Sequence, residues 1–152
     1  MKKIAIALCS LVCIATTAHA GLPKEMNHLK GRTGTLVTTY SGKVYANESN
    51  IECSVTEATY DDGTDSVMID AGSYFPATGF LEGSKKDVKG DTIVYTLNDS
   101  GKRPGGSACG DMVPLTSYKK TVEVTKNSLT IREKFTCAVF DRNDYIRTCT
   151  LK

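Results

Sequence analysis

Residues 105–111 read GGSACGD and set two potential nucleophiles, Ser107 and Cys109, among glycines, with Asp111 two residues further on. A nucleophilic serine in such a stretch needs a strand-to-helix turn and a histidine base. No helical periodicity follows residue 111, and histidine is nearly absent from the chain. We therefore interpret Cys109 as a disulfide anchor that tethers a flexible loop. We expect no catalytic residues and no enzymatic activity.

Histidine and metal-binding patterns are equally sparse. The chain contains His19 and His28, and only His28 follows the expected signal peptide. Because chain ends are often loosely ordered, we predict that His28 is a surface residue. Asp61 and Asp65 alternate as in a calcium loop, but the twelfth position of that loop is Gly72 instead of a glutamate. With no CxxC or HxxxH spacing either, we expect no metal and no cofactor.

Residues 1–20 have the form of a secretory signal peptide. Two lysines precede an apolar run from Ile4 to Ala15, and the small residues Ala18 and Ala20 suit cleavage after residue 20. The run is shorter than the roughly 20 residues that span a bilayer. We predict bacterial export to the periplasm or beyond, one domain over residues 21–152, and no integral membrane segment after signal removal.

The charge of the chain argues against nucleic acid as a partner. The whole sequence has 19 basic and 17 acidic residues, but two of the lysines belong to the signal peptide. The mature chain is therefore neutral overall, which removes the usual electrostatic reason for binding nucleic acid. Residues 61–99 are mainly acidic and residues 102–152 mainly basic. This asymmetry predicts complementary solvated faces, or a surface that steers a charged partner.

Four cysteines remain after export, and two disulfides are the expected outcome in an oxidising compartment. Cys137 and Cys149 flank a turn-like centre, and a loop at Arg142–Asp144 would place them opposite each other. This predicts Cys137–Cys149, which leaves Cys53 to bind Cys109. Sequence alone does not exclude the other pairings.

Strand patterns recur along the chain, whereas helical periodicity is absent. The pattern is clearest in the last third, where Leu129, Ile131, Phe135, Cys137 and Val139 alternate with polar residues such as Thr130, Arg132, Lys134 and Thr136. In the preceding strand Val122 and Val124 are expected to point inward. Such alternation is typical of antiparallel strands with one buried face. The predicted strands cover residues 34–40, 43–46, 51–60, 66–70, 91–97, 118–125, 129–139 and 145–151.

These runs predict an all-β fold, an antiparallel meander of about eight strands. Closing the meander into a small up-and-down, lipocalin-like barrel would remove its exposed edges. A two-sheet sandwich is the alternative, because two long connections interrupt the pattern at residues 71–90 and 98–111.

One short motif carries a family resemblance. Ser41-Gly42-Lys43-Val44-Tyr45 resembles the SGxxY pattern of bacterial periplasmic lysozyme inhibitors, which are small disulfide-bonded β-barrels. The resemblance implies that this loop enters the active-site cleft of the enzyme. The second motif of the C-type inhibitors requires a tryptophan, and this chain has none.

Taken together, these patterns predict a non-enzymatic, monomeric binding module that presents loops to a protein partner and is able to inhibit a cell-wall hydrolase. The alternatives are a carrier of a small apolar ligand in the barrel interior and a structural protein of the envelope. The candidate partner-binding residues are Ser41, Tyr45, Lys102, Arg103 and Ser107.

Overall fold

The computed structural model describes residues 22–59, 65–72, 77–80, 83–99, 115–138 and 143–152. The expected signal peptide lies outside these residues, as do Lys102, Arg103, Ser107 and Cys109. Secondary structure in the described part consists of strands and two short 3₁₀ helices. Neither helix is long and apolar enough to cross a membrane.

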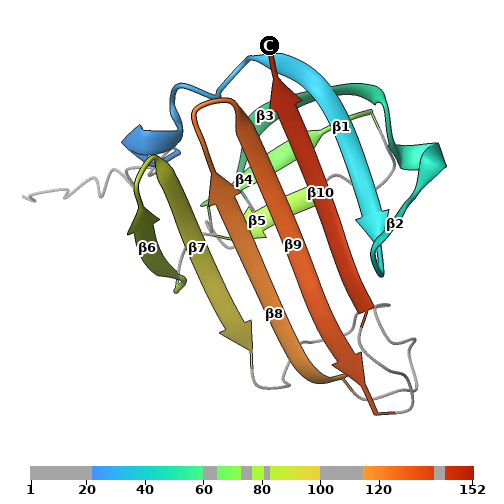
Figure 1. Cartoon of the computed structure of the whole chain (residues 1–152). Helices are drawn as coiled ribbons and strands as arrows, with labels where there is room; N and C mark the ends of the chain where they lie inside the picture. The colour runs from blue at the N-terminus through green and yellow to red at the C-terminus, as the bar shows by residue number, and fades with distance from the viewer. Residues whose placement is uncertain (1–21, 60–64, 73–76, 81–82, 100–114, 139–142) are drawn as a thin grey trace, which may run out of the picture.

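The described strands form one antiparallel sheet of ten strands (Figure 1). The strands are β1 (Thr33–Tyr40), β2 (Lys43–Val44), β3 (Ile51–Thr59), β4 (Asp65–Asp70), β5 (Ala77–Phe80), β6 (Lys85–Lys89), β7 (Thr92–Asp99), β8 (Leu115–Val124), β9 (Ser128–Cys137) and β10 (Asn143–Leu151). The 3₁₀ helices are η1 (Lys24–Met26), before the sheet, and η2 (Ala46–Glu48), between β2 and β3.

The predicted meander is confirmed, but the sheet is open and not a closed barrel. Nine strands lie in the order β5-β4-β3-β1-β10-β9-β8-β7-β6, and β2 pairs with β1 outside this path. The first long strand pairs with the last one, as in an up-and-down barrel. The break lies in the middle of the sequence, because β5 and β6 form the two ends of the sheet.

The expected count of eight strands was wrong because β5 and β6 lie in the stretch 71–90 that was interpreted as irregular. β5 has four residues, too few for an alternating pattern to emerge. β6 is an edge strand whose five residues, Lys-Lys-Asp-Val-Lys, are all exposed. A strand with no buried face shows no alternation, and lysines are common on exposed edges.

The sheet folds over on itself around β1, so that one continuous sheet forms two layers. In Figure 1, β8, β9 and β10 lie in front and β3, β4 and β5 lie behind them. β5 approaches β8 and β9 even though neither is its neighbour in the sheet. The sandwich alternative is therefore correct about two packed layers and wrong about two separate sheets.

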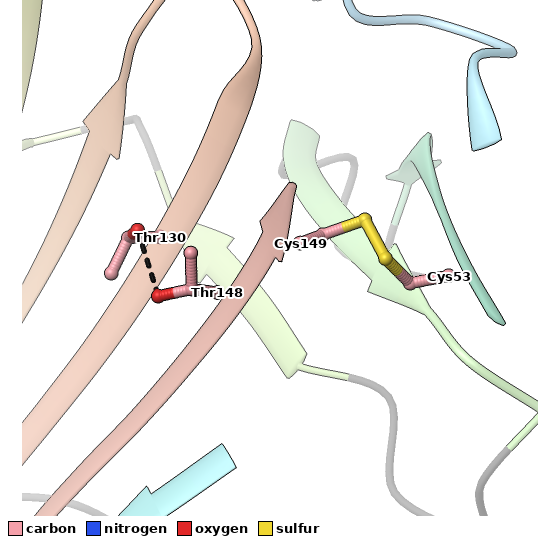
Figure 2. Close-up of a disulfide and its surroundings, with 4 residues drawn as sticks. All are labelled: Cys53, Thr130, Thr148 and Cys149. Atoms are coloured by element: carbon pink, nitrogen blue, oxygen red, sulfur yellow. Dashed lines mark hydrogen bonds between the residues drawn. A yellow bond between two sulfur atoms is a disulfide. The ribbon is translucent and has the colours of Figure 1, made fainter. Parts of the chain in front are cut away.

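A disulfide across β1 holds this fold in place. Cys53 on β3 and Cys149 on β10 lie on opposite sides of β1, and their sulfur atoms are bonded (Figure 2). In a flat sheet, two strands that flank a third lie about 9–10 Å apart. The two Cα atoms are 6.0 Å apart, so the sheet must bend sharply at β1.

Gly34 is the residue of β1 that allows this bend. It pairs with Cys53 on one side and with Leu151 on the other. A Cβ atom added at Gly34 would lie 2.0 Å from the carbonyl oxygen of Thr150, which is backbone and has no room to move aside. Position 34 therefore requires glycine because of space.

The predicted disulfide pairing is wrong in both bridges. Cys149 bonds to Cys53 instead of Cys137, and Cys53 is therefore not available to Cys109. The error came from the register of the last hairpin: β10 already begins at Asn143, which pairs with Phe135, so Cys149 lies opposite Leu129. Cys137 is not a free thiol either. One disulfide bond, Cys53–Cys149, is thus described.

The core follows the predicted alternation. Val122 and Val124 are buried, as are Leu129, Ile131 and Cys137, and Phe135 is half-buried. Val139 lies outside the described residues. Successive residues of β10 show the two faces directly: Thr148 points to Thr130 on β9, and Cys149 points to Cys53 (Figure 2). The largest fully buried side chains are Met26, Leu29, Leu36, Val55, Val67, Ile69, Val122, Val124, Leu129 and Ile131.

The segment Leu22–Arg32 packs against one end of the sheet, contrary to the expectation of a loosely ordered N-terminus. Met26 and Leu29 are both 0% exposed and belong to the same core as the strands. His28 is exposed, as predicted, and its Nε2 lies 3.0 Å from the carbonyl oxygen of Thr125. The polar composition of this segment concealed two apolar residues spaced three apart, which a 3₁₀ turn places on one side.

Polar contacts attach this segment to strands that are far apart in the sheet. Glu25 accepts hydrogen bonds from Lys86 on β6 and from the Tyr95 hydroxyl on β7, at 2.6 Å for the tyrosine. Lys30 forms an ion pair of 2.5 Å with Glu57 on β3. The Lys86 and Tyr95 hydrogen bonds lower the pKa of Glu25 to about 2. The segment thus links the β6–β7 end of the sheet to β3.

We expect Gly34→Ala to destabilise the fold by roughly 1–3 kcal/mol, because the new methyl group overlaps the β10 backbone. Urea unfolding of the oxidised protein measures this change. Thr35→Ala, at the adjacent position on the opposite face of β1, is the control and should cost less than about 0.5 kcal/mol. Equal stability of Gly34→Ala and the wild type would contradict the close approach of β1 to β10.

The depressed pKa of Glu25 predicts a specific acid dependence of stability. The ionised carboxylate stabilises the fold above pH 4.5, its ordinary pKa, and this contribution is lost as the pH falls towards about 2. We expect Glu25→Gln to lower stability by about 1–2 kcal/mol at neutral pH, since the carboxylate is partly exposed. The two proteins should converge in stability at the acid end of the titration.

Unfolding curves recorded across this pH range test the prediction. Glu123→Gln removes an exposed carboxylate that has no ion pair among the described residues, and should run parallel to the wild type. A Glu25→Gln variant that kept the full acid slope would show that another group is responsible.

Candidate functional site

The motif Ser41-Gly42 forms the predicted two-residue hairpin turn between β1 and β2. Tyr40 pairs with Lys43, and both turn residues have positive φ angles, 48° at Ser41 and 80° at Gly42. Two positive φ angles define a type I′ turn, whose twist matches that of the flanking strands. The backbone N–H of Ser41 also donates to the carbonyl of Asp144 at the start of β10, at 2.8 Å. The tip of the hairpin is therefore fixed to the sheet.

The backbone of Tyr45, the other predicted hairpin residue, is held on both sides. Its N–H donates to the Thr38 carbonyl at 2.8 Å. Its own carbonyl accepts hydrogen bonds from the hydroxyl of Ser49, at 2.8 Å, and from the N–H of Glu48, at 3.1 Å. Because the side chain is nevertheless 46% exposed, Tyr45 presents its ring to solvent from a fixed backbone.

A partly buried network of Arg147, Tyr145 and Glu48 holds the segment that follows the hairpin. Arg147 on β10 donates to Glu48 Oε2 at 3.1 Å and to the Tyr145 hydroxyl at 2.7 Å, and its guanidinium lies 4.3 Å from the centre of the Tyr145 ring. The Tyr145 hydroxyl in turn donates to Glu48 at 2.5 Å. Burial and the Glu48 hydrogen bond raise the pKa of Tyr145 to about 12. The network joins η2 to β10, which fixes the residue that precedes η2, Tyr45.

Exposed large hydrophobic side chains lie on both faces of this hairpin, Val44 and Val37 on the outer face and Tyr40 on the inner one. Val44 is 63% exposed, Tyr40 44% and Val37 37%, in addition to Tyr45. Among the described residues, the other large hydrophobic residue with comparable exposure is Val88 on β6. The Tyr40 ring packs edge-to-face on Tyr145, with 6.0 Å between centroids.

A second, partly buried ion pair lies on the inward face, in the same row as Tyr145. Lys120 on β8 is 3% exposed and lies 2.9 Å from Glu133, which also accepts a hydrogen bond from the Tyr118 hydroxyl at 2.7 Å. The strand registers place Lys120, Glu133, Tyr145 and Tyr40 side by side across four strands. The inward face therefore changes from apolar to polar towards the hairpin.

Two of the five predicted partner-binding residues, Ser41 and Tyr45, are brought together in the hairpin. Lys102, Arg103 and Ser107 lie outside the described residues. Sequence reasoning missed Glu48 in η2 and Arg147 in β10, because the sequence around a charged residue does not show whether it is buried. Tyr40 and Val44 had a usable signal, since Tyr40 directly precedes the Ser-Gly turn and Val44 lies two residues after it.

The exposed side chains determine what chemistry this site offers. It offers aromatic rings, aliphatic groups and the Ser41 hydroxyl on a fixed backbone. In the described ranges, no group of three or more His, Cys, Asp or Glu side chains is placed to hold a metal ion.

Comparisons with known proteins add little to this picture. No family model and no curated protein matches the chain. A crystal structure of a "putative outer membrane protein" from Bacteroides fragilis is similar over 83% of this chain, at 12% identity and a TM-score of 0.39. The alignment spans about half of that protein, 52% of its length. A similarity at this level carries no conclusion about shared function.

We expect Arg147→Met to destabilise the protein by roughly 2–4 kcal/mol, because it leaves the Glu48 carboxylate without its cation in a partly buried site. Amide hydrogen exchange at Tyr45 should become faster in the same variant, since η2 loses its link to β10. Arg147→Met combined with Glu48→Gln should recover part of the lost stability. Urea unfolding and exchange measured by NMR test both effects.

Arg132→Met is the matched control for this experiment. Arg132 pairs with Asp144 at 3.3 Å, but its side chain is half exposed, so the loss should stay below about 1 kcal/mol. Equal costs for the two arginine variants would mean that the network does not support the hairpin in the way described.

Proposed function

We propose that the protein is an exported, non-enzymatic binding module that acts through the β1–β2 hairpin on a protein partner. The observation that carries this proposal is the exposure of Tyr40, Val44 and Tyr45 on a hairpin whose backbone is fixed. Exposed apolar groups gathered in one place mark interaction surfaces in soluble proteins. The disulfide Cys53–Cys149 agrees with export to an oxidising compartment.

The rigidity of the hairpin favours binding with little ordering cost. Both turn residues, the Tyr45 backbone and η2 are held by hydrogen bonds before any partner arrives. A preorganised loop loses less conformational entropy on association than a flexible one. An exposed tyrosine on such a loop is a typical anchor in protein interfaces.

A cell-wall hydrolase of the lysozyme type is the partner that we infer. The resemblance of Ser41-Gly42-Lys43-Val44-Tyr45 to the SGxxY motif of periplasmic lysozyme inhibitors supports this inference. The turn of that motif is a type I′ hairpin here, and both turn residues are exposed. Because the chain lacks tryptophan, the proposal rests on this first motif alone.

The alternative of a small apolar ligand inside the fold has less support. It requires inward residues that line a cavity. Val55, Val67, Leu129 and Cys149 are each 0% exposed, and Met26 from the N-terminal segment fills space between the layers. No observation on the described residues favours a purely structural role in the envelope.

Inhibition assays against several lysozyme types test the proposal. We expect the wild-type protein to inhibit at least one type, and Tyr45→Ala to raise the inhibition constant by about thirtyfold or more, as for an interface anchor. Ser41→Gly keeps the turn geometry and removes the hydroxyl, so any smaller loss reports the hydroxyl alone.

Val88→Ala is the matched control, because Val88 is an exposed valine on β6, away from the hairpin. Its inhibition constant should equal that of the wild type. If the folded wild-type protein inhibits no lysozyme type at micromolar concentration, the hydrolase partner is excluded. Equal effects of Tyr45→Ala and Val88→Ala would exclude the hairpin as the site.

A further inference from the structure

The outer face of β8 and β9, turned away from the core, carries a cluster of cations. Outward positions alternate with the buried ones, and they include Lys119 on β8 and Arg132 and Lys134 on β9. This face belongs to the front layer in Figure 1, on the side opposite to β3, β4 and β5. We call Lys119, Arg132 and Lys134 the cationic strip.

Two lysines of the strip face each other across the β8–β9 pair, and on its other side Lys134 faces Asp144 of β10, which pairs with Arg132. Lys119 and Lys134 are direct partners in the β8–β9 register. Like charges at directly opposed positions destabilise a sheet. Elsewhere on this face cations are paired: Arg132 has Asp144 at 3.3 Å and Lys89 has Asp87 at 3.6 Å. Within the described part of the chain, neither Lys119 nor Lys134 has an ion pair.

Aliphatic side chains continue the face from the strip to the hairpin. Ile146 pairs with Arg132 on one side and with Thr39 on the other, and Thr39 pairs with Val44. Val44 is 63% exposed, and Val37, on the same face of β1, is 37% exposed. One outer face therefore presents unpaired cations beside exposed aliphatic groups.

We propose that this face binds the surface of an anionic lipid membrane; Val44 belongs to this face and to the hairpin, whereas Lys119 and Lys134 belong to this face alone. Phosphate groups of lipids would neutralise the opposed lysines, and the valines would contact the apolar boundary below the headgroups. Binding of this kind combines attraction to anionic lipids with burial of apolar side chains. An anionic polysaccharide or an acidic protein surface would also neutralise the lysines. A polysaccharide, however, offers no apolar region for the exposed valines to contact.

Sedimentation with vesicles of equal parts phosphatidylglycerol and phosphatidylcholine tests the proposal, using the full mature protein. We expect binding at about 0.01 M salt, weakening at about 0.15 M as screening increases. Lys119→Gln combined with Lys134→Gln should reduce the partition coefficient by about thirtyfold, the effect of two cations near an anionic surface. Val44→Ser should weaken binding by about threefold or more.

The matched control is Lys24→Gln combined with Lys126→Gln. Both lysines are exposed, and Lys126 lies in the turn after β8, roughly 20 Å from Lys119. This variant has the same net charge as the strip variant and should bind vesicles like the wild type. Circular dichroism of each variant verifies the fold.

Several outcomes would overturn the proposal. Absence of wild-type binding to the anionic vesicles at low salt excludes it, as do equal losses in the strip and control variants, which would indicate an effect of net charge only. Binding to heparin that matches vesicle binding and is insensitive to Val44→Ser would identify a polysaccharide instead. Lysozyme inhibition by the strip variant is measured separately, so that failure of the hairpin function and failure of the membrane surface are distinguishable.

Discussion

The rest of the structure depends on the sharp bend of one sheet at β1. A flat sheet of this length would leave its apolar face exposed to water along all strands. The bend turns β3, β4 and β5 back over β8 and β9, and the two inner faces then bury each other. Gly34 supplies the space for the bend, and the Cys53–Cys149 bond holds the flanking strands together across it. Both features lie within the stretch Gly34–Leu36 of β1, where Cys53 pairs with Gly34 and Cys149 with Leu36, and the sheet bends there without closing into a barrel.

The position of the hairpin follows from this bend. β1 is shared by the two layers, and its C-terminal end runs on into the Ser41-Gly42 turn. Beyond Leu36 the strand no longer pairs with β3, because η2 intervenes and returns the chain through Ser49. At this end of the sheet the apolar core stops, and the inward positions are occupied by the network of Arg147, Glu48 and Tyr145. This network holds the loop by hydrogen bonds and an ion pair at the boundary of the core, where apolar packing ends.

Much of the sheet was predictable from alternation alone, and the exceptions have physical causes. β8, β9 and β10 read clearly because one face of each is buried. β5 and β6 were missed because they lie at the ends of the sheet, where alternation is weak. The disulfide pairing depended on the exact register of one hairpin, and no local pattern sets a register.

The candidate site was partly predictable for a similar reason. A Ser-Gly turn between two β-rich runs is a local signal, and it identified Ser41 and Tyr45. Arg147 and Lys120 are buried because of pairings between distant strands, and nothing in their neighbours along the chain distinguishes them from surface residues. The bend itself was not predictable either, since Gly34 resembles any other glycine at the start of a strand.

The pairing of β1 with β10 also has a consequence for the order of events during folding. The strand at the bend, β1, is the first long strand, but one of its two neighbours is β10, which comes last among the described strands. Cys149 lies 96 residues after Cys53. A chain that emerges from a ribosome or a membrane channel, N-terminus first, can form local hairpins but cannot complete the bend until β10 arrives. Such non-local closure delays compaction, so the chain stays unfolded for as long as it is being threaded.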